Sequence, residues 1–401
     1  MTNTDSLFRV AHFADLHVCQ KHADQLFHCI DYAFAHAIAS KADLAVLAGD
    51  TFDGVLAVHD PAFRSFLQRF ALLAKNIPVV VLQGTLSHDR AGSIRVLNEI
   101  EYTNPVLVVD TPGQYLLLSS GGFQRIDGEA ALEDCSALLN ILPCEARLRK
   151  DTTVDHLRPL CEAWSHNTSL ARAKGIPTML LAHGSVGGCT TESGHGIDNQ
   201  GADFNVDLFS TCGAHVTLLG DIHKHQYIPY TNGVAAYPGS LARMVHGHND
   251  PTGYLLWAFS EWVGFKSTFI PTPSWPFVAL DFPGMPDIEV IRGALFAEHT
   301  NVRVRYSVPH KTAHEVDPLL IRRILESKGA TVKIEGTVIP LQSVRSSGIA
   351  SCPTLLEKIT QWAITVGATE HVAALHERLR QLQSEDVDSI AASYFHFDDE
   401  A

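Results

Sequence analysis

The chain has 401 residues, of which 46% are hydrophobic and 18% are charged, as expected for a globular protein of about two or three domains. Its formal net charge of −14 argues against broad non-specific binding of nucleic acid, unless a local basic patch, bound cations or a partner supplies a positive field. No stretch reaches the ~20 apolar residues of a membrane span, the N-terminus lacks the features of a secretory signal, and the eight cysteines include no C-x-x-C pair. We therefore expect a cytoplasmic protein with no membrane association.

Along the first 270 residues, short apolar runs alternate with segments of helical periodicity. The predicted helices cover 22–40 and 61–75, and in the second of these apolar residues recur at spacings of three and four. Residues 113–145 and 227–270 have a more antiparallel character, with turn signals between short strands. The other predicted strands cover 8–13, 42–48, 78–82, 104–110, 177–182 and 215–220. Near-continuous apolar strands joined by helices are typical of sheets covered on both faces, so we predict a layered α/β core.

After residue 270 the pattern changes. The segment 271–277 is rich in proline and is typical of a linker. A strand, a helix and a second strand, which together indicate a small α+β domain, are predicted at 301–308, 318–329 and 330–338. Amphipathic patterns from 353 to 385 predict one or two helices that bind a partner. The three predicted domains are a core domain at 1–270, a small domain at 275–340 and a helical tail at 345–401.

Side chains that can bind metals follow five of the apolar runs, at the C-terminal end of each. In α/β folds these ends form the crevice where ligands bind, so we expect the side chains to converge on one site. Asp15 and His17 are two residues apart and would point the same way if the strand continues through them, and Asp221 and His223 repeat this spacing. Mixed carboxylate and imidazole ligands suit Mn²⁺, Zn²⁺ or Fe²⁺, and a site so rich in ligands can hold two ions about 3.5–4 Å apart. The candidates are Asp15, His17, Asp50, Asp53, His88, Asp89, His183, Asp221, His223 and His225.

The order of the motifs D-L-H, G-D-T-F-D, G-T-L-S-H-D, A-H-G and G-D-I-H resembles the signature of the calcineurin-like metallophosphoesterase superfamily. Within it the chain is most similar to the SbcD-type nucleases, the bacterial counterparts of the eukaryotic double-strand-break repair nuclease. The forms G-D-T-F-D, G-D-I-H-K-H-Q and Y-P-G-S-L-A-R at 237–243 carry that similarity. The resemblance covers residues 7–245 and extends loosely to the small domain and tail. It implies a four-layer α/β/β/α metallophosphoesterase sandwich with a small α+β cap domain that recognises DNA and a helical C-terminal tail.

The resemblance also implies a site with two divalent metal ions. The expected ions are Mn²⁺, with Mg²⁺, Fe²⁺ or Zn²⁺ as alternatives. By similarity, Asp15, His17 and His223 would hold one ion. Asp50 would bridge both ions, and His183 would bind the second.

Two further roles, and two departures from the family, concern the remaining motif residues. His88 would donate a proton to the leaving oxygen or stabilise charge on the phosphate, and Asp53 would orient its ring. The family usually has an Asn directly before this His, in G-N-H-D. Here the motif is G-T-L-S-H-D, two residues longer, and only Thr85, Ser87 or water offers a neutral oxygen to the second ion. Asp221 replaces the first His of G-H-x-H, and its carboxylate would join the metal ligands and offset the lost amide.

These features predict a Mn²⁺-dependent DNA exonuclease and endonuclease that hydrolyses phosphodiester bonds by two-metal catalysis. The expected partners are DNA and an SbcC-type, SMC-like coiled-coil ATPase that binds the C-terminal helices, and a homodimer is left open. The alternatives are a small-molecule or phosphoprotein phosphatase on the same core, or a metal-bound scaffold without catalysis. The chain beyond residue 275 favours the nuclease, since a single-domain phosphatase needs neither a cap nor an amphipathic tail.

Overall fold

The computed structural model describes residues 7–54, 57, 59–144, 150–248, 250–340 and 348–384. Residues 1–6 of the predicted core domain, and 345–347 and 385–401 of the predicted tail, lie outside the described residues. The chain divides into two compact units. The first unit comprises Met1–Phe282, Pro286–Arg305 and Pro318–Glu335, and the second comprises Pro283–Met285, Tyr306–Asp317 and Gly336–Ala401. The predicted three-domain boundaries stay a prediction.

The first unit contains a six-stranded sheet with the order β13-β12-β1-β2-β3-β4. Neighbouring strands from β1 to β4 run parallel, whereas β12 is antiparallel to both β1 and β13. The strands are β1 (Phe8–Phe13), β2 (Leu44–Leu47), β3 (Val79–Leu82), β4 (Val106–Val109), β12 (Gly253–Ser260) and β13 (Gly264–Pro271). β1, β2 and β3 therefore end at the same edge of this sheet.

A seven-stranded sheet with the order β10-β11-β9-β8-β7-β5-β6 forms the other half of this unit. β7, β8, β9 and β11 pair in parallel, and the strands at both edges pair antiparallel. The strands are β5 (Gly113–Leu118), β6 (Phe123–Ile126), β7 (Cys135–Leu142), β8 (Thr178–His183), β9 (Val216–Gly220), β10 (Gln226–Tyr230) and β11 (Gly233–Tyr237).

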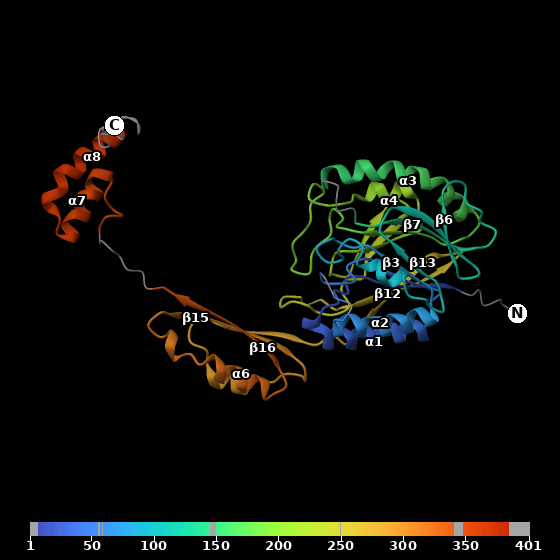
Figure 1. Ribbon diagram of the computed structural model, residues 1–401, viewed down its shortest axis with the longest axis horizontal. Helices are drawn as coiled ribbons and strands as arrows, with labels where there is room; N and C mark the ends of the chain where they lie inside the picture. Colours follow the sequence, from blue (N-terminus) through green and yellow to red (C-terminus); the bar gives the residue numbers. More distant parts are fainter. Residues whose placement is uncertain are drawn as a thin grey trace, which may run out of the picture. The chain divides into compact units, whose positions relative to one another are not determined.

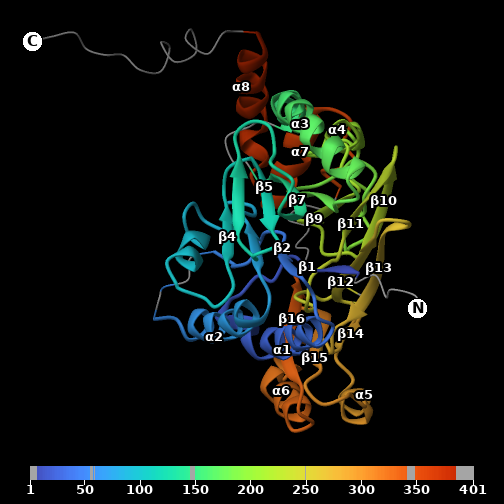
Figure 2. The ribbon, with the colours of Figure 1, turned by 90° about the vertical axis from the view of Figure 1, so that its right-hand side faces the viewer.

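The two sheets pack face to face, and apolar side chains from both form one buried cluster. Val46 and Val80 from the first sheet share this cluster with Leu139 and Leu181 from the second. Helices α1 (Ala23–Ala39) and α2 (Pro61–Asn76) cover the outer face of the first sheet, and α3 (Lys150–Ala173) and α4 (Val206–Cys212) cover the outer face of the second (Figures 1 and 2). The mixed α/β fold predicted from the alternating segments is confirmed.

Helix α2 illustrates why the periodic segments fold as predicted. The Asp60 carboxylate caps its N-terminus by accepting a hydrogen bond from the Ala62 N–H at 2.7 Å, and Pro61 occupies the first turn, where no N–H is needed. Phe63, Phe66 and Phe70 lie on the buried face. Each such side chain contributes roughly 1.5–3 kcal/mol when it is removed from water, so packing fixes this helix on the sheet.

A three-stranded sheet with the order β14-β15-β16 follows the core, and it carries two helices. The predicted strand–helix–strand order is present as β15, α6 and β16. The elements are β14 (Phe277–Phe282), α5 (Ile288–Gly293), β15 (Asn301–Pro309), α6 (Pro318–Glu326) and β16 (Thr331–Ile339). The described residues also form short 3₁₀ helices at η1 (Gln20–His22), η2 (Ile94–Asn98), η3 (Ala313–Glu315) and η4 (Thr369–His371).

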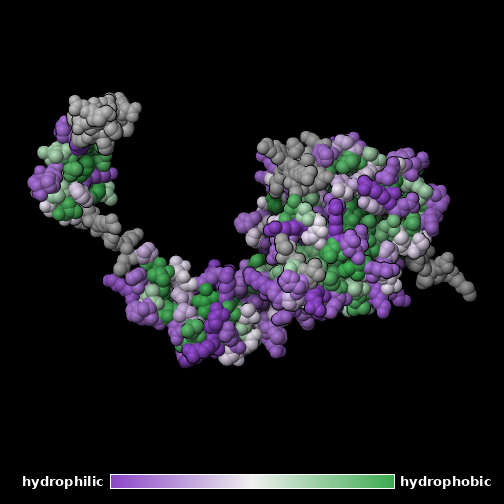
Figure 3. Space-filling view, in the orientation of Figure 1, coloured by the Kyte–Doolittle hydropathy of each residue, from purple (hydrophilic) through white to green (hydrophobic). Residues whose placement is uncertain are grey.

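The second unit ends in the helices α7 (Leu355–Val366) and α8 (Val372–Ser384), which pack against each other. The His376 ring joins them through hydrogen bonds with the Thr360 hydroxyl and the Leu356 carbonyl, both at 2.9 Å. Large apolar side chains of this pair, including Trp362 and Ile364, remain exposed, and Figure 3 shows apolar surface on these helices. None of the described helices in either unit combines the length and apolar character needed to cross a membrane.

Candidate metal centre

The candidate site lies where the loops after β1, β2, β3, β8 and β9 meet, so both large sheets contribute to it. Hydrogen bonds join the two sheets there, including two that involve the backbone. The Asp221 N–H donates to the Asp15 carboxylate at 2.9 Å, and the His183 Nδ1–H donates to the Ala48 carbonyl at 2.7 Å. Strands that are far apart in the sequence therefore place their polar ends at one seam between the sheets.

The predicted ligands converge there in three overlapping groups. Within each group, one ligand atom from every residue lies within 4.8 Å of the others. The groups are Asp15, His17 and His223; Asp15, Asp50 and His183; and His17, Asp53 and His88. Asp221 lies beside the second group, with its carboxylate 3.9 Å from His183 Nε2. The structure thus brings together all eight residues predicted as metal ligands or catalytic groups, while their individual roles stay predictions.

Two candidates near these motifs lie elsewhere. His225 Nδ1 donates to the Tyr237 carbonyl at 2.8 Å, and its ring stacks on Phe269 at a centroid distance of 4.4 Å. The buried Asp89 carboxylate accepts hydrogen bonds from three backbone N–H groups, of Thr51, Phe52 and Gly84, at 2.9–3.1 Å. His225 is therefore part of the packing of β10 and β13, and Asp89 anchors the loop that carries His88.

The backbone at the ligands differs from the prediction. β1 ends at Phe13, so the strand does not continue through Asp15 and His17. Both residues instead adopt left-handed conformations, with φ of 52° and 49°, and Asp50 and Asp221 also have positive φ, of 48° and 105°. Each such conformation costs on the order of 1–3 kcal/mol in a non-glycine residue, and such strain clusters at functional sites. The turn is held because the His17 N–H donates to the Asp50 carbonyl at 2.9 Å.

Two glycines allow the close approach of these loops, and their role was missed at the sequence level. A Cβ atom at Gly49, which has φ of 91°, would lie 2.1 Å from His183 Nδ1. A Cβ atom at Gly84 would lie 2.1 Å from the Asp50 backbone nitrogen. The G-D and Q-G pairs directly after apolar runs were the available signal, because glycine permits such backbone approach.

Of the two hydroxyl residues predicted to replace the family Asn, Thr85 is the one that lies next to Asp50. Its N–H and its hydroxyl both donate to Asp50 Oδ1, at 2.7 Å and 2.9 Å. Ser87 is exposed, and its hydroxyl donates to the Thr85 hydroxyl at 3.4 Å. Because the Thr85 hydroxyl donates its hydrogen to the carboxylate, its lone pairs remain available to a cation.

His88 and Asp53 form the most accessible part of the site. Their side chains are 34% and 48% exposed, and His88 Nδ1 lies 3.0 Å from Asp53 Oδ1. The His88 ring meets that of His17 edge to face at a centroid distance of 4.4 Å. With Nδ1 bonded to Asp53, Nε2 is the nitrogen of His88 available for proton transfer.

The buried atoms of the site fit a cation. Asp15 Oδ2 and His183 Nε2 are buried without a hydrogen-bond partner in the described chain, and the Nε2 atoms of His17 and His223 face each other at 2.9 Å. Converging imidazole nitrogens and carboxylate oxygens are ligands that Mn²⁺, Zn²⁺ and Fe²⁺ accept. The residues present therefore fit the predicted divalent ions.

The pKa values of two histidines in the site show how burial and neighbouring charges act on them. Burial alone would lower the pKa of His183, but attraction by Asp50, Asp221 and Asp15 raises this pKa to about 10. Burial, followed by repulsion from His223, lowers the pKa of His17 to about 3. The carboxylates around His183 thus favour a positive charge there. Either a proton on the His183 ring or a metal ion bound to Nε2 can supply that charge.

Comparison with known proteins gives a family and several distant relatives. The family model for calcineurin-like phosphoesterases matches residues 8–225. An uncharacterised protein of Acanthamoeba polyphaga mimivirus is 24% identical over 266 residues, and the match covers 63% of this chain but only 17% of the length of that relative.

Solved structures with similarity to the chain include two proteins. GAP50, the anchor in the inner membrane complex of Plasmodium, is 13% identical with a TM-score of 0.45, and the match covers 67% of this chain and 85% of GAP50. A dimetal phosphatase from Danio rerio is 12% identical with a TM-score of 0.39, and the match covers 66% of this chain and all of that protein. Likenesses this distant do not indicate a substrate.

The family match includes every predicted metal ligand and both predicted catalytic residues, from Asp15 to His223. It spans more than half of the 401 residues. The superfamily predicted from the order of the motifs is therefore confirmed, and the chain belongs to the calcineurin-like phosphoesterase family.

Proposed function

We propose that this protein is a metal-dependent DNA nuclease of the SbcD type. Membership of the family supports hydrolysis of phosphoester bonds with two divalent metals. The observation that carries the proposal is the overlap of the three ligand groups with the accessible His88–Asp53 pair. DNA as the substrate, and Mn²⁺ as the metal, rest on the resemblance of the individual motifs to SbcD-type nucleases.

The residues divide into two sets of ligands. Asp15, His17 and His223 would hold one ion, and Asp50 would contribute to both. His183 would hold the second ion, with Asp221 and the Thr85 hydroxyl beside it. When bound, the ions supply Lewis acidity that neutralises phosphate oxygens and lowers the pKa of a water molecule.

His88 and Asp53 would act on the substrate side. Asp53 holds the His88 ring through Nδ1, so that Nε2 can donate a proton to the leaving 3′ oxygen. The left-handed turn at Asp15 and His17 keeps both ligand side chains in place before the substrate arrives. Such preorganisation reduces the reorganisation that the reaction would otherwise require.

The remaining predictions extend the proposal beyond the site. The two packed sheets with their outer helices would form the four-layer sandwich, and β14–β16 with α5 and α6 would form its cap. The exposed apolar side chains of α7 and α8 would bind the coiled-coil ATPase. A chain that ends before α7 should lose that binding; if it binds the ATPase as tightly as the full chain, the proposed role of these helices is wrong.

The test of the nuclease proposal uses purified protein with Mn²⁺. The substrates are labelled linear duplex DNA, single-stranded DNA, a generic phosphodiester and a phosphomonoester. We expect DNA cleavage that requires the metal and that falls by about 100-fold or more in His88→Ala and in Asp50→Asn. The matched control is His28→Ala, which removes an exposed histidine from α1.

Two outcomes would contradict the proposal in different ways. Strong phosphomonoesterase activity without DNA cleavage would identify a phosphatase on the same core. DNA cleavage that survives both site substitutions would place the catalytic centre elsewhere.

A further inference from the structure

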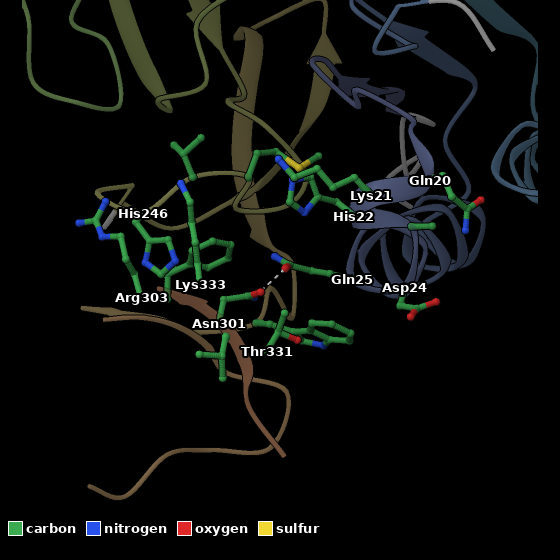
Figure 4. Close-up of a pocket in the computed structure, with 16 residues that line it drawn as sticks. Gln20, Lys21, His22, Asp24, Gln25, His246, Asn301, Arg303, Thr331 and Lys333 are labelled. Carbon is green, nitrogen blue, oxygen red and sulfur yellow. Dashed lines mark hydrogen bonds between the residues drawn. The ribbon is translucent and has the colours of Figure 1, made fainter. Parts of the chain in front are cut away.

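A cavity of about 590 Å³ lies in the first unit, between the start of α1 and the three-stranded sheet (Figure 4). One wall consists of η1 and the first residues of α1, and it begins at Gln20, three residues after His17. The opposite wall comes from the starts of β15 and β16 and the segment around Phe277, and the segment 244–246 also contributes. None of the lining residues belongs to the predicted metal or catalytic set. The cavity is therefore distinct from the predicted metal centre, although one of its walls begins three residues after His17.

Cationic side chains outnumber acidic ones in the lining of this cavity. Figure 4 shows Lys21 and His22 on the side of η1, and Arg303, Lys333 and His246 on the other side. Burial, followed by repulsion from Arg303 and Lys333, lowers the pKa of His246, as expected in a positive field. An anionic ligand would relieve this repulsion.

The charges in the cavity are only partly neutralised by the protein. Asp24 is the one acidic side chain among the residues that line it. Arg303 Nε is buried and has no hydrogen-bond partner in the described chain. Lys333 pairs with Glu335 at 2.6 Å, but both side chains are solvent-accessible, and exposed pairs of this kind are weak. Arg303 and Lys333 can therefore both turn to an anion in the cavity.

A buried glutamine holds the two walls in a fixed arrangement. Gln25 Nε2 donates to the Arg243 carbonyl at 2.9 Å and to the Ser274 hydroxyl at 3.0 Å. Its Oε1 accepts a hydrogen bond from Asn301 Nδ2 at 3.3 Å, the contact drawn in Figure 4. These bonds join α1, the segment after β11, the linker and β15. The walls of the cavity are thus joined by hydrogen bonds within the protein itself.

The size and aromatic content of the cavity match a nucleotide. Small-ligand sites usually have volumes of roughly 300–1,000 Å³. Trp275 and Phe277 contribute aromatic surface, and Trp275 is held by stacking on His299 at a centroid distance of 4.7 Å. Sites for single-stranded nucleic acid combine cationic side chains for the phosphates with aromatic side chains for the bases. The lining offers both.

We infer that this cavity binds one nucleotide, with its phosphate held by Arg303, Lys333 and Lys21 and its base against Trp275 and Phe277. The inference rests on the proposed function, in which a strand cleaved at the metal centre supplies the nucleotide. Gln20, at one end of the cavity wall, is three residues after His17, so the chain places this wall within roughly 11 Å of a predicted metal ligand. Binding itself requires neither the metal nor His88.

The test measures binding in EDTA, so that cleavage does not interfere. The probes are thymidine monophosphate, followed by calorimetry, and a fluorescein-labelled single-stranded oligothymidylate, followed by anisotropy. We expect Arg303→Gln with Lys333→Gln to weaken binding of both probes by about 10-fold or more. The salt dependence of oligonucleotide binding should fall by about 0.7 in log–log slope for each phosphate that the protein no longer neutralises. Arg303→Lys, which keeps the charge, should retain most of that slope.

The matched control is Arg305→Gln. It removes the same charge two residues further along β15, at a residue that pairs with Asp281 and does not line the cavity. We expect thymidine monophosphate binding to stay within about twofold of wild type in this variant. If the double variant, with an unchanged melting temperature, bound every probe that binds to wild type as tightly as wild type does, the inference would be overturned. An equal loss of binding in Arg305→Gln would overturn it as well.

The two probes also separate the source of the nucleotide. If only the oligonucleotide binds and the double variant loses that binding, the subsite is for a strand; if both bind, it also accepts a free nucleotide. Either result supports the inference. Failure of DNA cleavage in the nuclease test, with binding in EDTA intact, would remove the proposed function and leave the nucleotide site.

Discussion

The metal centre and the nucleotide cavity are neighbours in the chain, but they are fixed by different means. At the metal centre the backbone sets the geometry, through left-handed residues such as Asp15 and Asp50 and through glycines at the closest approaches. In the cavity the side chains set it, through the hydrogen bonds of Gln25 and the cations around it. Adding a side chain at Gly49 or Gly84 would therefore disturb the metal centre through its backbone, whereas a substitution in the cavity acts through the side chain that it removes.

The largest expected effect is at the backbone of the metal centre. Gly49→Ala should lower the free energy of unfolding by about 3 kcal/mol, because the new Cβ meets the His183 ring and the residue keeps a positive φ. Denaturant unfolding measures this loss. The control is Gly54→Ala, since Gly54 also has positive φ, of 85°, but has nothing within 4 Å of the added atom. Similar losses in both variants would show that strain alone, and not packing against His183, limits this position.

The next effect depends on pH and concerns the anchor of the His88 loop. Burial raises the pKa of Asp89 to about 6, despite its three hydrogen bonds from backbone N–H groups. The folded state therefore holds a proton more tightly than the unfolded state, whose pKa is near 3.8. The contribution of Asp89 protonation to the free energy of unfolding should rise by on the order of 2 kcal/mol as pH falls from 6 to about 4, and this contribution should be lost as pH rises through about 6.

The measurement for Asp89 compares unfolding of wild type and Asp89→Asn in EDTA across this pH range. The difference between the two proteins isolates the titration of this one group. A difference that is constant from pH 7 to pH 4 would show that Asp89 has the same pKa in both states.

At the cavity, the expected loss of stability is smaller than at Gly49. Gln25→Ala removes three hydrogen bonds and should lower the free energy of unfolding by about 1–2 kcal/mol. It should also weaken nucleotide binding, because Asn301 loses its partner, while metal binding stays unchanged. Calorimetry with the metal alone and with thymidine monophosphate separates the two. Loss of metal binding in this variant would mean that the two sites are not independently fixed.

The smallest effect tests the hydroxyl beside Asp50. Thr85→Val should weaken the binding of the second metal ion by about 10-fold, because Asp50 loses a hydrogen bond and the ion loses the Thr85 oxygen. Ser87→Ala should leave the affinity unchanged, because the Ser87 hydroxyl bonds to the Thr85 hydroxyl and not to Asp50. Metal titration of both variants is the measurement, and an equal loss in the two would favour a hydrogen-bonded pair of hydroxyls over Thr85 alone.

The strands and helices of the core were predictable because burial leaves a simple pattern. β1 coincides with its predicted run 8–13, and α2 begins at Pro61 and ends one residue beyond the prediction. Such segments are fixed by apolar periodicity and by local caps, both of which are visible in the sequence. Part of the convergence was predictable for a related reason: Asp15 and Asp50 lie at the ends of neighbouring parallel strands, as do His183 and His223, and the ends of parallel strands share an edge. The meeting of these two edges at one site depends on the packing of the two sheets, which no local pattern shows.

The conformation of the loops and the cavity could not be predicted in the same way. The turns at Asp15 and His17 depend on hydrogen bonds with the loop after β2, which lies more than thirty residues away. The choice of Thr85 over Ser87 depends on the path of a loop longer than that of the family. The cavity combines Lys21, Arg303 and Lys333, whose proximity follows from tertiary packing and leaves no local motif.

The hydrogen bonds from Asp221 to Asp15 and from His183 to Ala48 also bear on how the protein unfolds. They cross from one large sheet to the other, and the ligands of each proposed ion come from both sheets. Neither sheet can separate from the other without dismantling the centre, so the two halves form one cooperative unit. An ion bound there at a thousandfold excess over its Kd would stabilise that whole unit by about 4 kcal/mol. Chelation should therefore accelerate hydrogen exchange in strands of both sheets together, including β7, which carries no ligand.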